Sequence, residues 1–484
     1  MVRYGTPAGR WVLFATIVGS GIASLDATVV NVALPTIGRQ FGSGVAGLQW
    51  VITSYLITLS ALILLGGSLG DLFGRRRIFV IGVIWFSGAS LLSGLSVNLN
   101  MLIAARALQG IGGALLVPGS LAIIEASFVP EDRSRAIGAW SGLGGVAAAI
   151  GPFFGGWLVS AVSWRLIFLL NLPLAAAVLL AARRVPETTN PSSDRHVDLL
   201  GAGFGVVGLA SATYALIEGP SPGSSPAVVV AAAVLGALGL VGFVVVERTS
   251  PHPMIPLGIF ASRQFTTANL VTFAVYGALS AAFFLLAVDL QQVLRFSPVA
   301  AGGALFPVTV IMLLLSARAG QLAQRIGPRL PMTMGPLIVS AGLLLMLRIS
   351  PGGHYVSDVL PAVVVFGFGL SLTVAPLTST VLAAADESHA GVASGVNNAV
   401  ARVAGLLGVA VVPALAGLTG AAYREAATFS AGFHRAMLIA AGATLTGGLI
   451  AAVGIRNPRP VRAAAPAESC CPIDGPPLRR QAIG

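Results

Sequence analysis

Apolar stretches of about 20 residues recur along almost all of this 484-residue chain, from Trp11 to Val453. A helix needs about 20 apolar residues to cross the ~30 Å hydrocarbon core of a bilayer. Only 9% of the residues are charged, whereas soluble domains carry about 25%. A single soluble core stops growing at about 250–300 residues. We therefore expect an all-α integral membrane protein whose solvent is the lipid bilayer.

The hydropathy pattern predicts fourteen spans, an even count that puts both chain ends on one side. All 28 basic residues are arginine: nineteen fall in loops on the side of the termini, six in loops on the other side and three within spans. Because positively charged loops stay in the cytoplasm, both termini are predicted to be cytoplasmic. The expected spans are 12–34, 47–69, 78–96, 101–124, 136–160, 164–182, 199–218, 227–246, 265–287, 299–323, 331–349, 359–382, 392–416 and 433–454.

The formal charge of +11 does not indicate a nucleic-acid binder, because the arginines lie in short clusters between apolar runs rather than in one patch. The chain has no Gly-x4-Gly-Lys loop, no His-Glu-x-x-His motif and no nucleophile elbow on a strand–helix turn. We expect neither an enzyme nor ATP-driven transport by this chain alone. Transport would then be driven by an ion gradient or be passive, and we expect no cofactor and no metal.

An internal repeat divides the chain. The loop after the second span, Gly67–Arg76, shares Gly, Leu, Gly and Arg at matching spacing with the loop after the tenth, Gly320–Arg329. The fifth and thirteenth spans are both Gly-rich and end near a proline. Chance similarity between Gly-rich helices is the alternative. Repeated helical halves are typical of secondary transporters, which bind substrate between the halves at the membrane midplane.

The repeat predicts four parts of the chain. They are an N-terminal six-helix half (1–185), two inserted helices with linkers (186–262), a C-terminal six-helix half (263–455) and a cytoplasmic tail (456–484). The tail is rich in Pro, Arg and Ala and contains Cys470 and Cys471, so we expect it to be disordered.

Asp26 lies in the middle of the first predicted span, where an ionisable group costs several kcal/mol unless it pairs or faces water. Arg106 lies at comparable depth in the fourth span and shares a helix face with Gln109. We expect Asp26 and Arg106 to pair and to couple transport to protons. The alternatives are a purely structural carboxylate and an arginine that snorkels outward.

Small residues and a proline characterise the fifth span: Gly142, Gly145, Gly151, Pro152, Gly155 and Gly156. Small residues allow helices to pack closely, and a proline allows a bend. This composition would support rocking of one half against the other, although plain packing explains it equally well.

The short loop after the second span is a candidate cytoplasmic gate, formed by Gly67, Asp71, Gly74, Arg75 and Arg76. Asp71 is expected to hold one conformation by pairing with a basic residue of the next loop, such as Arg133. A solvated loop charge is the alternative.

Polar residues in or near the spans are candidates for a substrate cavity: Asn31, Gln109, Asp289 and Arg402. Asp289 falls near the outer end of the ninth span, a position where interfacial residues are common. Arg402 lies deeper and either lines the pore or bonds to backbone carbonyls.

Taken in order, the motifs resemble those of the fourteen-span drug:proton antiporters of the major facilitator superfamily, over nearly the whole chain to about Arg456. The matching segments are Leu25–Pro35, Gly67–Arg77, Arg106–Gly110, Gly151–Gly156, Trp164–Pro173, Leu290–Pro298 and Gly391–Asn398. The resemblance implies the major facilitator fold and proton-driven export of small amphiphilic compounds, such as drugs, antibiotics or natural products, by alternating access. It also implies a multi-pass protein of a bacterial plasma membrane, and we expect a monomer because the two halves already enclose one site.

The chain departs from the pattern of these antiporters in two respects. Gln324 stands where the second-half loop often carries Asp, which weakens any latch there. No second deep acid is expected in the C-terminal half, so neutral or singly charged substrates fit better than dications. A transporter of a dedicated metabolite and a non-transporting sensor or scaffold remain as alternatives.

Overall fold

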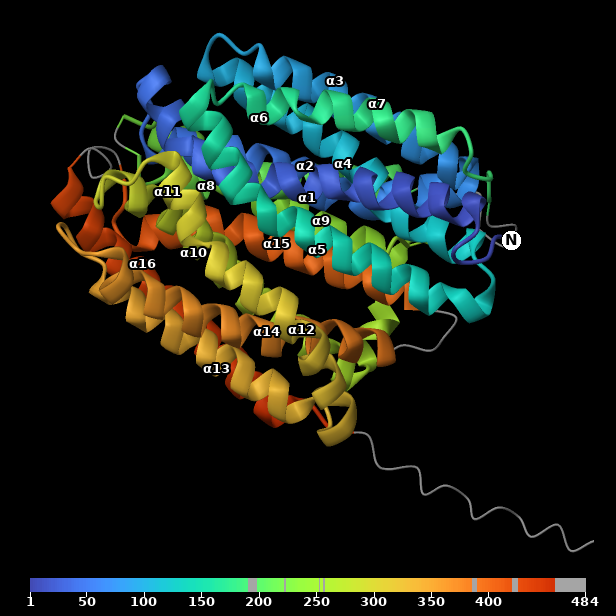
Figure 1. Cartoon of the computed structure of the whole chain (residues 1–484). Helices are drawn as coiled ribbons and strands as arrows, with labels where there is room; N and C mark the ends of the chain where they lie inside the picture. Colours follow the sequence, from blue (N-terminus) through green and yellow to red (C-terminus); the bar gives the residue numbers. More distant parts are fainter. Residues whose placement is uncertain are drawn as a thin grey trace, which may run out of the picture.

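The computed structural model is a bundle of long helices (Figure 1) and describes residues 1–189, 198–221, 223–251, 253–255, 257–384, 390–419 and 425–457. Nearly all of the predicted tail, with Cys470 and Cys471, lies outside these residues. The α-helices are α1 (Pro7–Phe41), α2 (Val45–Phe73), α3 (Arg75–Gly94), α4 (Leu99–Ser127), α5 (Pro130–Ala161), α6 (Leu166–Leu169), α7 (Asn171–Ala182), α8 (Leu199–Glu218), α9 (Pro226–Thr249), α10 (Arg263–Gln292), α11 (Pro298–Ala304), α12 (Phe306–Ile326), α13 (Arg329–Leu345), α14 (Leu360–Ala383), α15 (Ala390–Leu415) and α16 (Ala426–Gly454). Short helical turns are η1 (Leu257–Ala261), η2 (Met346–Arg348) and η3 (Tyr355–Val359).

Each predicted span overlaps a helical segment. Within the described residues, twelve segments are long and apolar enough to cross a bilayer. Two shorter apolar helical segments, Ile150–Ala161 and Leu166–Ala182, lie at the fifth and sixth predicted spans. The protein is therefore all-helical, and many of its helices are long and apolar enough to cross a membrane.

Two predicted spans are interrupted helices rather than continuous ones. The sixth divides into α6 and α7 at Leu170, and the tenth divides into α11 and α12 at Leu305. Pro307 explains the second break, because a proline has no N–H for the helical hydrogen bond to the carbonyl four residues earlier. Leu305 N–H bonds instead to Gly302 O, three residues back, at 3.3 Å.

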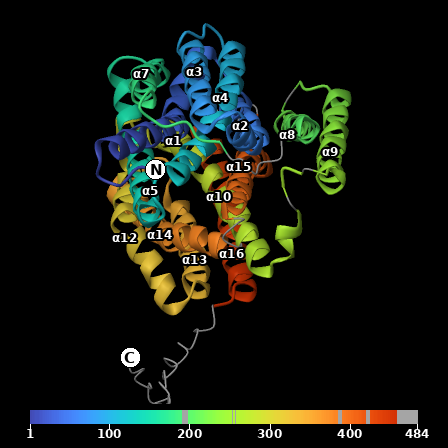
Figure 2. The same ribbon diagram turned by 90° about the vertical axis from the view of Figure 1, so that its right-hand side faces the viewer.

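The helices pack in two groups. In the first, α4 packs on α2 and α3, and α1 packs on α5 and α7. In the second, α10 packs on α15 and α16, while α14 packs on α12 and α13. The hairpin of α8 and α9 stands beside both groups (Figure 2), attached through α8 to α2 and α15. Only 11% of the residues in the most apolar window of α9 are buried, so most of this helix lies on the outside of the bundle, where it packs mainly on α8.

The two groups join through α1 with α10, α2 with α15, and α5 with α11 and α12. Gln49 Nε2 donates to Val409 O at 2.7 Å, and Gln291 Nε2 donates to Val32 O at 2.9 Å. The end of the bundle that carries α11 lies opposite the N-terminus (Figure 1).

At that same end, α5 and α11 approach so closely that a Cβ on Gly156 would collide with Pro298 O, and a Cβ on Gly302 with Pro152 O. Glycine is therefore required at this junction between the two groups.

The variant Gly156→Val tests this junction. The added side chain would push α5 away from α11 and is expected to cost about 1–3 kcal/mol, as overpacking does. Gly88→Val on α3 is the matched control, because a Cβ on Gly88 meets no atom within 4 Å. Thermal unfolding in detergent micelles should show a lower midpoint for Gly156→Val alone. Equal midpoints for the two variants would contradict the close contact.

Candidate functional site

The structure brings Asp26 and Arg106 together in the interior of the first helical group. Arg106 Nη1 lies 2.5 Å from Asp26 Oδ2, and both side chains are only 1% exposed. Such a pair is costly to desolvate and is tolerated only when its remaining hydrogen-bonding atoms also find partners. The snorkelling alternative for Arg106 is therefore wrong in this conformation.

Those further partners come from three polar side chains with no exposed surface. Gln109 Oε1 accepts from Arg106 Nη1 at 2.7 Å, and its Nε2 donates to Asp26 Oδ1 at 2.9 Å and to Ser90 Oγ at 3.1 Å. Asn171 Nδ2 donates to Ser90 Oγ at 2.8 Å and to Asp26 Oδ1 at 3.3 Å. The carboxylate of Asp26 is thus held by groups from α4 and α7, with α3 bracing them.

The guanidinium of Arg106 also lies 5.8 Å from the centre of the Phe168 ring on α6 and has two contacts on α2. Its Nε donates to Val51 O at 3.2 Å, and its central carbon lies 4.4 Å from the centre of the Tyr55 ring. This stacking is a cation–π contact. Arg106 therefore ties α4 to both α1 and α2.

Glycines on α4 make this geometry accessible. A Cβ on Gly110 would collide with Thr58 Oγ1 and the Tyr55 carbonyl on α2, and a Cβ on Gly112 would meet the Phe86 backbone on α3 within 2.7 Å. The close approach of these backbones brings Arg106 to α2 and Gln109 to α3.

Sequence reasoning missed Ser90 altogether and noted Asn171 only as part of a motif. Both are polar residues in apolar spans and are fully buried. That combination is the signal that would have marked Asn171, because an amide within a membrane helix needs a partner. A serine carries little signal, since its hydroxyl often bonds to its own helix; Ser90 instead donates to Phe168 O at 3.0 Å.

The remaining cavity candidates do not join this network. Asn31 is half-buried, and its Nδ2 donates to Ala27 O of its own helix at 3.3 Å. Asp289 has no exposed surface, so it does not line open space in this conformation. Among the described residues, neither of its carboxylate oxygens has a hydrogen-bond partner.

The C-terminal half therefore contains a buried acid, although Asp289 lies near the end of its helix, as expected. The helix that carries Asp289 continues to Gln292, past the predicted span end at residue 287, and its neighbours bury the carboxyl group.

The Gly-rich segment of α5 connects the site to the second helical group. A Cβ on Gly151 would collide with Thr28, and one on Gly155 with Val29, both close to Asp26 on α1. The same segment contacts α11 through Pro152 and Gly156. Gly142 and Gly145 lie in α5, but their surroundings are outside the described residues.

Where α2 meets α3, Asp71 in the last turn of α2 pairs with Arg75 at the start of α3 rather than with Arg133. Both Nε and Nη2 of Arg75 lie 2.8 Å from Asp71 Oδ1. Arg133 Nε donates instead to Phe128 O at 3.2 Å. The expected latch to the next loop is therefore not formed in this conformation. Gly67 is half-buried at the end of α2, facing Pro118 on α4.

Glu187, which sequence reasoning missed, caps the start of α3. Its carboxylate accepts from the backbone N–H groups of Arg76 at 3.0 Å and Arg77 at 3.1 Å, where the helix dipole favours an anion. Gly74 has a φ of +107°, and a Cβ there would lie 2.8 Å from that carboxylate.

The connection between α12 and α13 also has a glycine with positive φ and a polar side chain that caps the following helix. Gly327 has a φ of +89°, and Asn457 Oδ1 accepts from Arg329 N at 3.0 Å. Glu187 and Asn457 each follow the last helix of their group, so two segments with little sequence similarity play equivalent parts.

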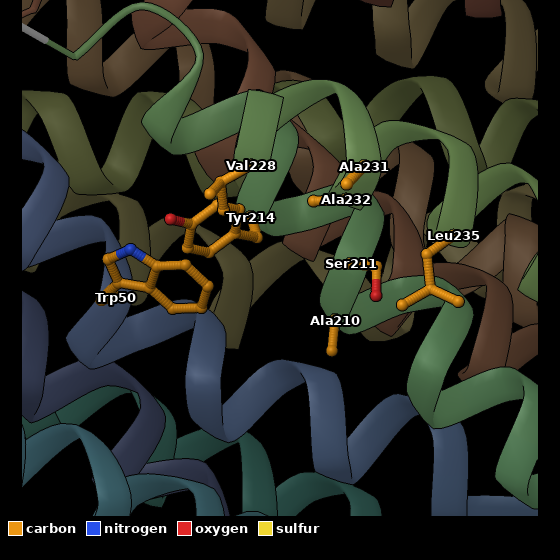
Figure 3. A pocket seen from close by; sticks show the side chains of 8 residues that line it. All are labelled: Trp50, Ala210, Ser211, Tyr214, Val228, Ala231, Ala232 and Leu235. Carbon is orange, nitrogen blue, oxygen red and sulfur yellow. The ribbon is translucent and has the colours of Figure 1, made fainter. Parts of the chain in front are cut away.

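Away from this site, an apolar pocket of about 470 Å³ lies between α2, α8 and α9 (Figure 3). It contains none of the candidate residues. Trp50 at its rim donates from Nε1 to Glu218 Oε1 at 2.8 Å. Its lining residues are Trp50, Ala210, Ser211, Tyr214, Val228, Ala231, Ala232 and Leu235.

The buried ion pair predicts a compensating pair of substitutions. Arg106→Gln alone should lower stability by about 3–5 kcal/mol, because it leaves Asp26 as an unpaired buried charge. Asp26→Asn combined with Arg106→Gln should recover most of that loss, since no charge is then buried. Thermal unfolding of the purified variants in detergent measures the coupling. A double variant as unstable as Arg106→Gln would argue against the pair.

Asp289 predicts the opposite behaviour from Asp26. Asp289→Val should raise stability by about 1–3 kcal/mol, because it removes buried polar atoms that lack partners. Asp26→Val should lower stability, because it strands the guanidinium of Arg106. Chemical or thermal unfolding of both variants provides the comparison. A destabilised Asp289→Val protein would mean that ordered water satisfies the carboxyl group.

Comparison with known proteins gives the same picture as the fold. Residues 16–409 match the family described as Major Facilitator Superfamily. The Puromycin resistance protein pur8 of Streptomyces alboniger is 36% identical over 86% of this chain and 84% of its own length. The Methylenomycin A resistance protein of Bacillus subtilis (strain 168) is 34% identical over 89% and 91%.

Among solved structures, a bacterial homologue of the human lysosomal transporter Spinster, in an inward-facing and unoccupied conformation, has a similar fold. The TM-score is 0.67 at 17% identity, over 93% of this chain and 97% of that one. The family match, the relatives and the helical fold agree, and the chain belongs to the major facilitator superfamily.

Proposed function

We propose that this protein exports small amphiphilic compounds, such as drugs, antibiotics or natural products, in exchange for protons. Its relatives are named for resistance to puromycin and methylenomycin A, for export of tetracenomycin C and for transport of actinorhodin. The observation that carries the proton coupling is the Asp26–Arg106 pair, a titratable acid buried inside the bundle.

Protonation of Asp26 would act on the helix packing. A neutral Asp26 no longer attracts Arg106, which keeps its bonds to Val51 O and Gln109. The helix α1 would then be free to shift against α4. Because α1 packs on α5, and α5 packs on α11, this shift reaches the contact between the two helical groups. The energy would come from the proton gradient, without a cofactor.

We propose that fourteen segments cross the membrane: the twelve longer ones, together with α5 and the α6–α7 pair. The six-helix halves would be residues 1–185 and 263–455, and α8 and α9 would be the inserted pair in residues 186–262. The contacts of α2 with α15 and of α5 with α11 and α12 support this division. A two-fold axis between the halves exchanges the second span with the tenth and the fifth with the thirteenth, so the two contacts are equivalent.

The positive-inside pattern supports cytoplasmic termini in a bacterial plasma membrane. The contacts at the end opposite the N-terminus would then close the outer face and leave the protein open to the cytoplasm. One enclosed site between two halves supports a functional monomer.

Proteoliposomes with an internal pH dye test the proposal. Addition of puromycin, methylenomycin A or other amphiphiles should change the internal pH with the wild-type protein, and Asp26→Asn should abolish the response. Glu131→Gln, an exposed acid in the first turn of α5, is the control and should behave as wild type.

A wild-type protein that binds labelled compounds without moving protons would contradict the proposal. That result would favour another coupling ion, a dedicated metabolite or a non-transporting role. An intact response in Asp26→Asn would remove Asp26 from the coupling mechanism.

A further inference from the structure

Arg402 is a membrane-embedded cation without a matching anion. It lies near the middle of α15 and is half-buried. No acidic side chain of the described residues lies within ion-pair distance of it, in contrast to Arg106. A charge at this depth is expensive, so it normally faces water, a partner or a ligand.

The helix periodicity shows which way Arg402 points. On α15, Leu406 packs with Ile57 of α2 and Leu209 of α8. The opposite side of α15 faces α10, since a Cβ on Gly408 would collide with Gly277. Successive residues turn by about 100° around a helix, so Arg402 lies on nearly the same face as Leu406 but is rotated from it toward the α10 side.

Of the two gaps between α2 and α10, Arg402 occupies the one away from α8. Val403, the next residue, is on the α8 side, whereas Gly405 on the Arg402 side faces Ser280 of α10. Asn398, one turn earlier on the same face, is exposed and Arg402 is half-buried, so part of this face of α15 is not covered by protein.

Two tyrosines lie near Arg402, on helices that pack against α15. Tyr55 on α2 and Tyr276 on α10 both lie within electrostatic range of it. Tyr55 also stacks on Arg106, with the guanidinium carbon 4.4 Å from the ring centre. Tyr55 is therefore a neighbour of both the coupling site in the first helical group and Arg402 in the second.

The charges in this region do not cancel. Asp26 and Arg106 neutralise each other. On the helices packed against α15, Asp289 of α10 is fully buried, Glu218 lies at the end of α8 bound to Trp50, and α14 carries no charged residue. On α16, His434 and Arg435 lie near the helix start and add no negative charge. Arg402 is left as one uncompensated positive charge.

We propose that Arg402 binds the acidic group of the transported compound, so that the preferred substrates are amphiphiles with one carboxylate or acidic hydroxyl group. The inference rests on the proposed export function and names its substrate class. A guanidinium presents paired N–H donors that match a carboxylate, and the half-buried Tyr276 supplies aromatic surface in the same region. Cationic compounds of equal size would be repelled.

A charge series in one scaffold tests the inference: 1-naphthoic acid, 1-naphthamide and 1-naphthylmethylamine. Binding to the purified full-length protein, measured by fluorescence, should be at least about tenfold tighter for the acid than for the amine. Arg402→Gln should weaken acid binding about tenfold and leave amide binding unchanged. Arg402→Lys should keep part of the preference. Arg318→Gln on α12 is the control and should match wild type.

Several outcomes would overturn the inference. A wild-type protein that binds the amine as well as or better than the acid is one, and it does not depend on any variant folding. An unchanged acid-to-amide ratio in Arg402→Gln is another, with amide binding as the check that the variant is folded. Proton movement driven by the amide tests the export proposal separately, so failure of the substrate class and failure of antiport are distinguishable.

Discussion

A single buried ion pair determines how the helices of the first group pack together. Lipid and packed side chains offer no solvation for Asp26 and Arg106, so the pair must satisfy itself. It does so with Gln109, Asn171 and Ser90, and these groups come from different helices. The positions of α1, α3, α4 and α7 are therefore tied to one protonation state. Loss of the charge on Asp26 would remove an ion pair that joins α1 to α4.

Small residues link the charge pair to the second helical group, because glycines allow the helix backbones to come into close contact. The same α5 segment contacts α1 near Asp26 on one face and α11 on the other. Close-packed interfaces of this kind shift between discrete arrangements rather than deforming gradually. The charge pair and the junction of the helical groups are thus mechanically adjacent, although they belong to different parts of the sequence.

Hydropathy alone located every long helix, since each must present about 20 apolar residues to lipid. Asp26 and Arg106 were predictable because they break that pattern at equal depth. Ser90 and Glu187 were not, because their roles depend on which helix faces them. Asp289 was misjudged for a similar reason: its burial is decided by neighbouring helices. The break at Leu305 was readable from Pro307, but the apolar run across it suggested one continuous span.

That break has a mechanical consequence. The seven-residue α11 packs on α5, whereas α12 packs chiefly on α14 and to a smaller extent on α5, and Leu305 joins the two helices. A rigid rod of 29 residues would have to tilt as a whole to release α5. Because the helix is interrupted at Leu305, α11 can move away from α5 while α12 stays packed on α14. The contact between α5 and α11 can then open without a rearrangement of α12 and α14.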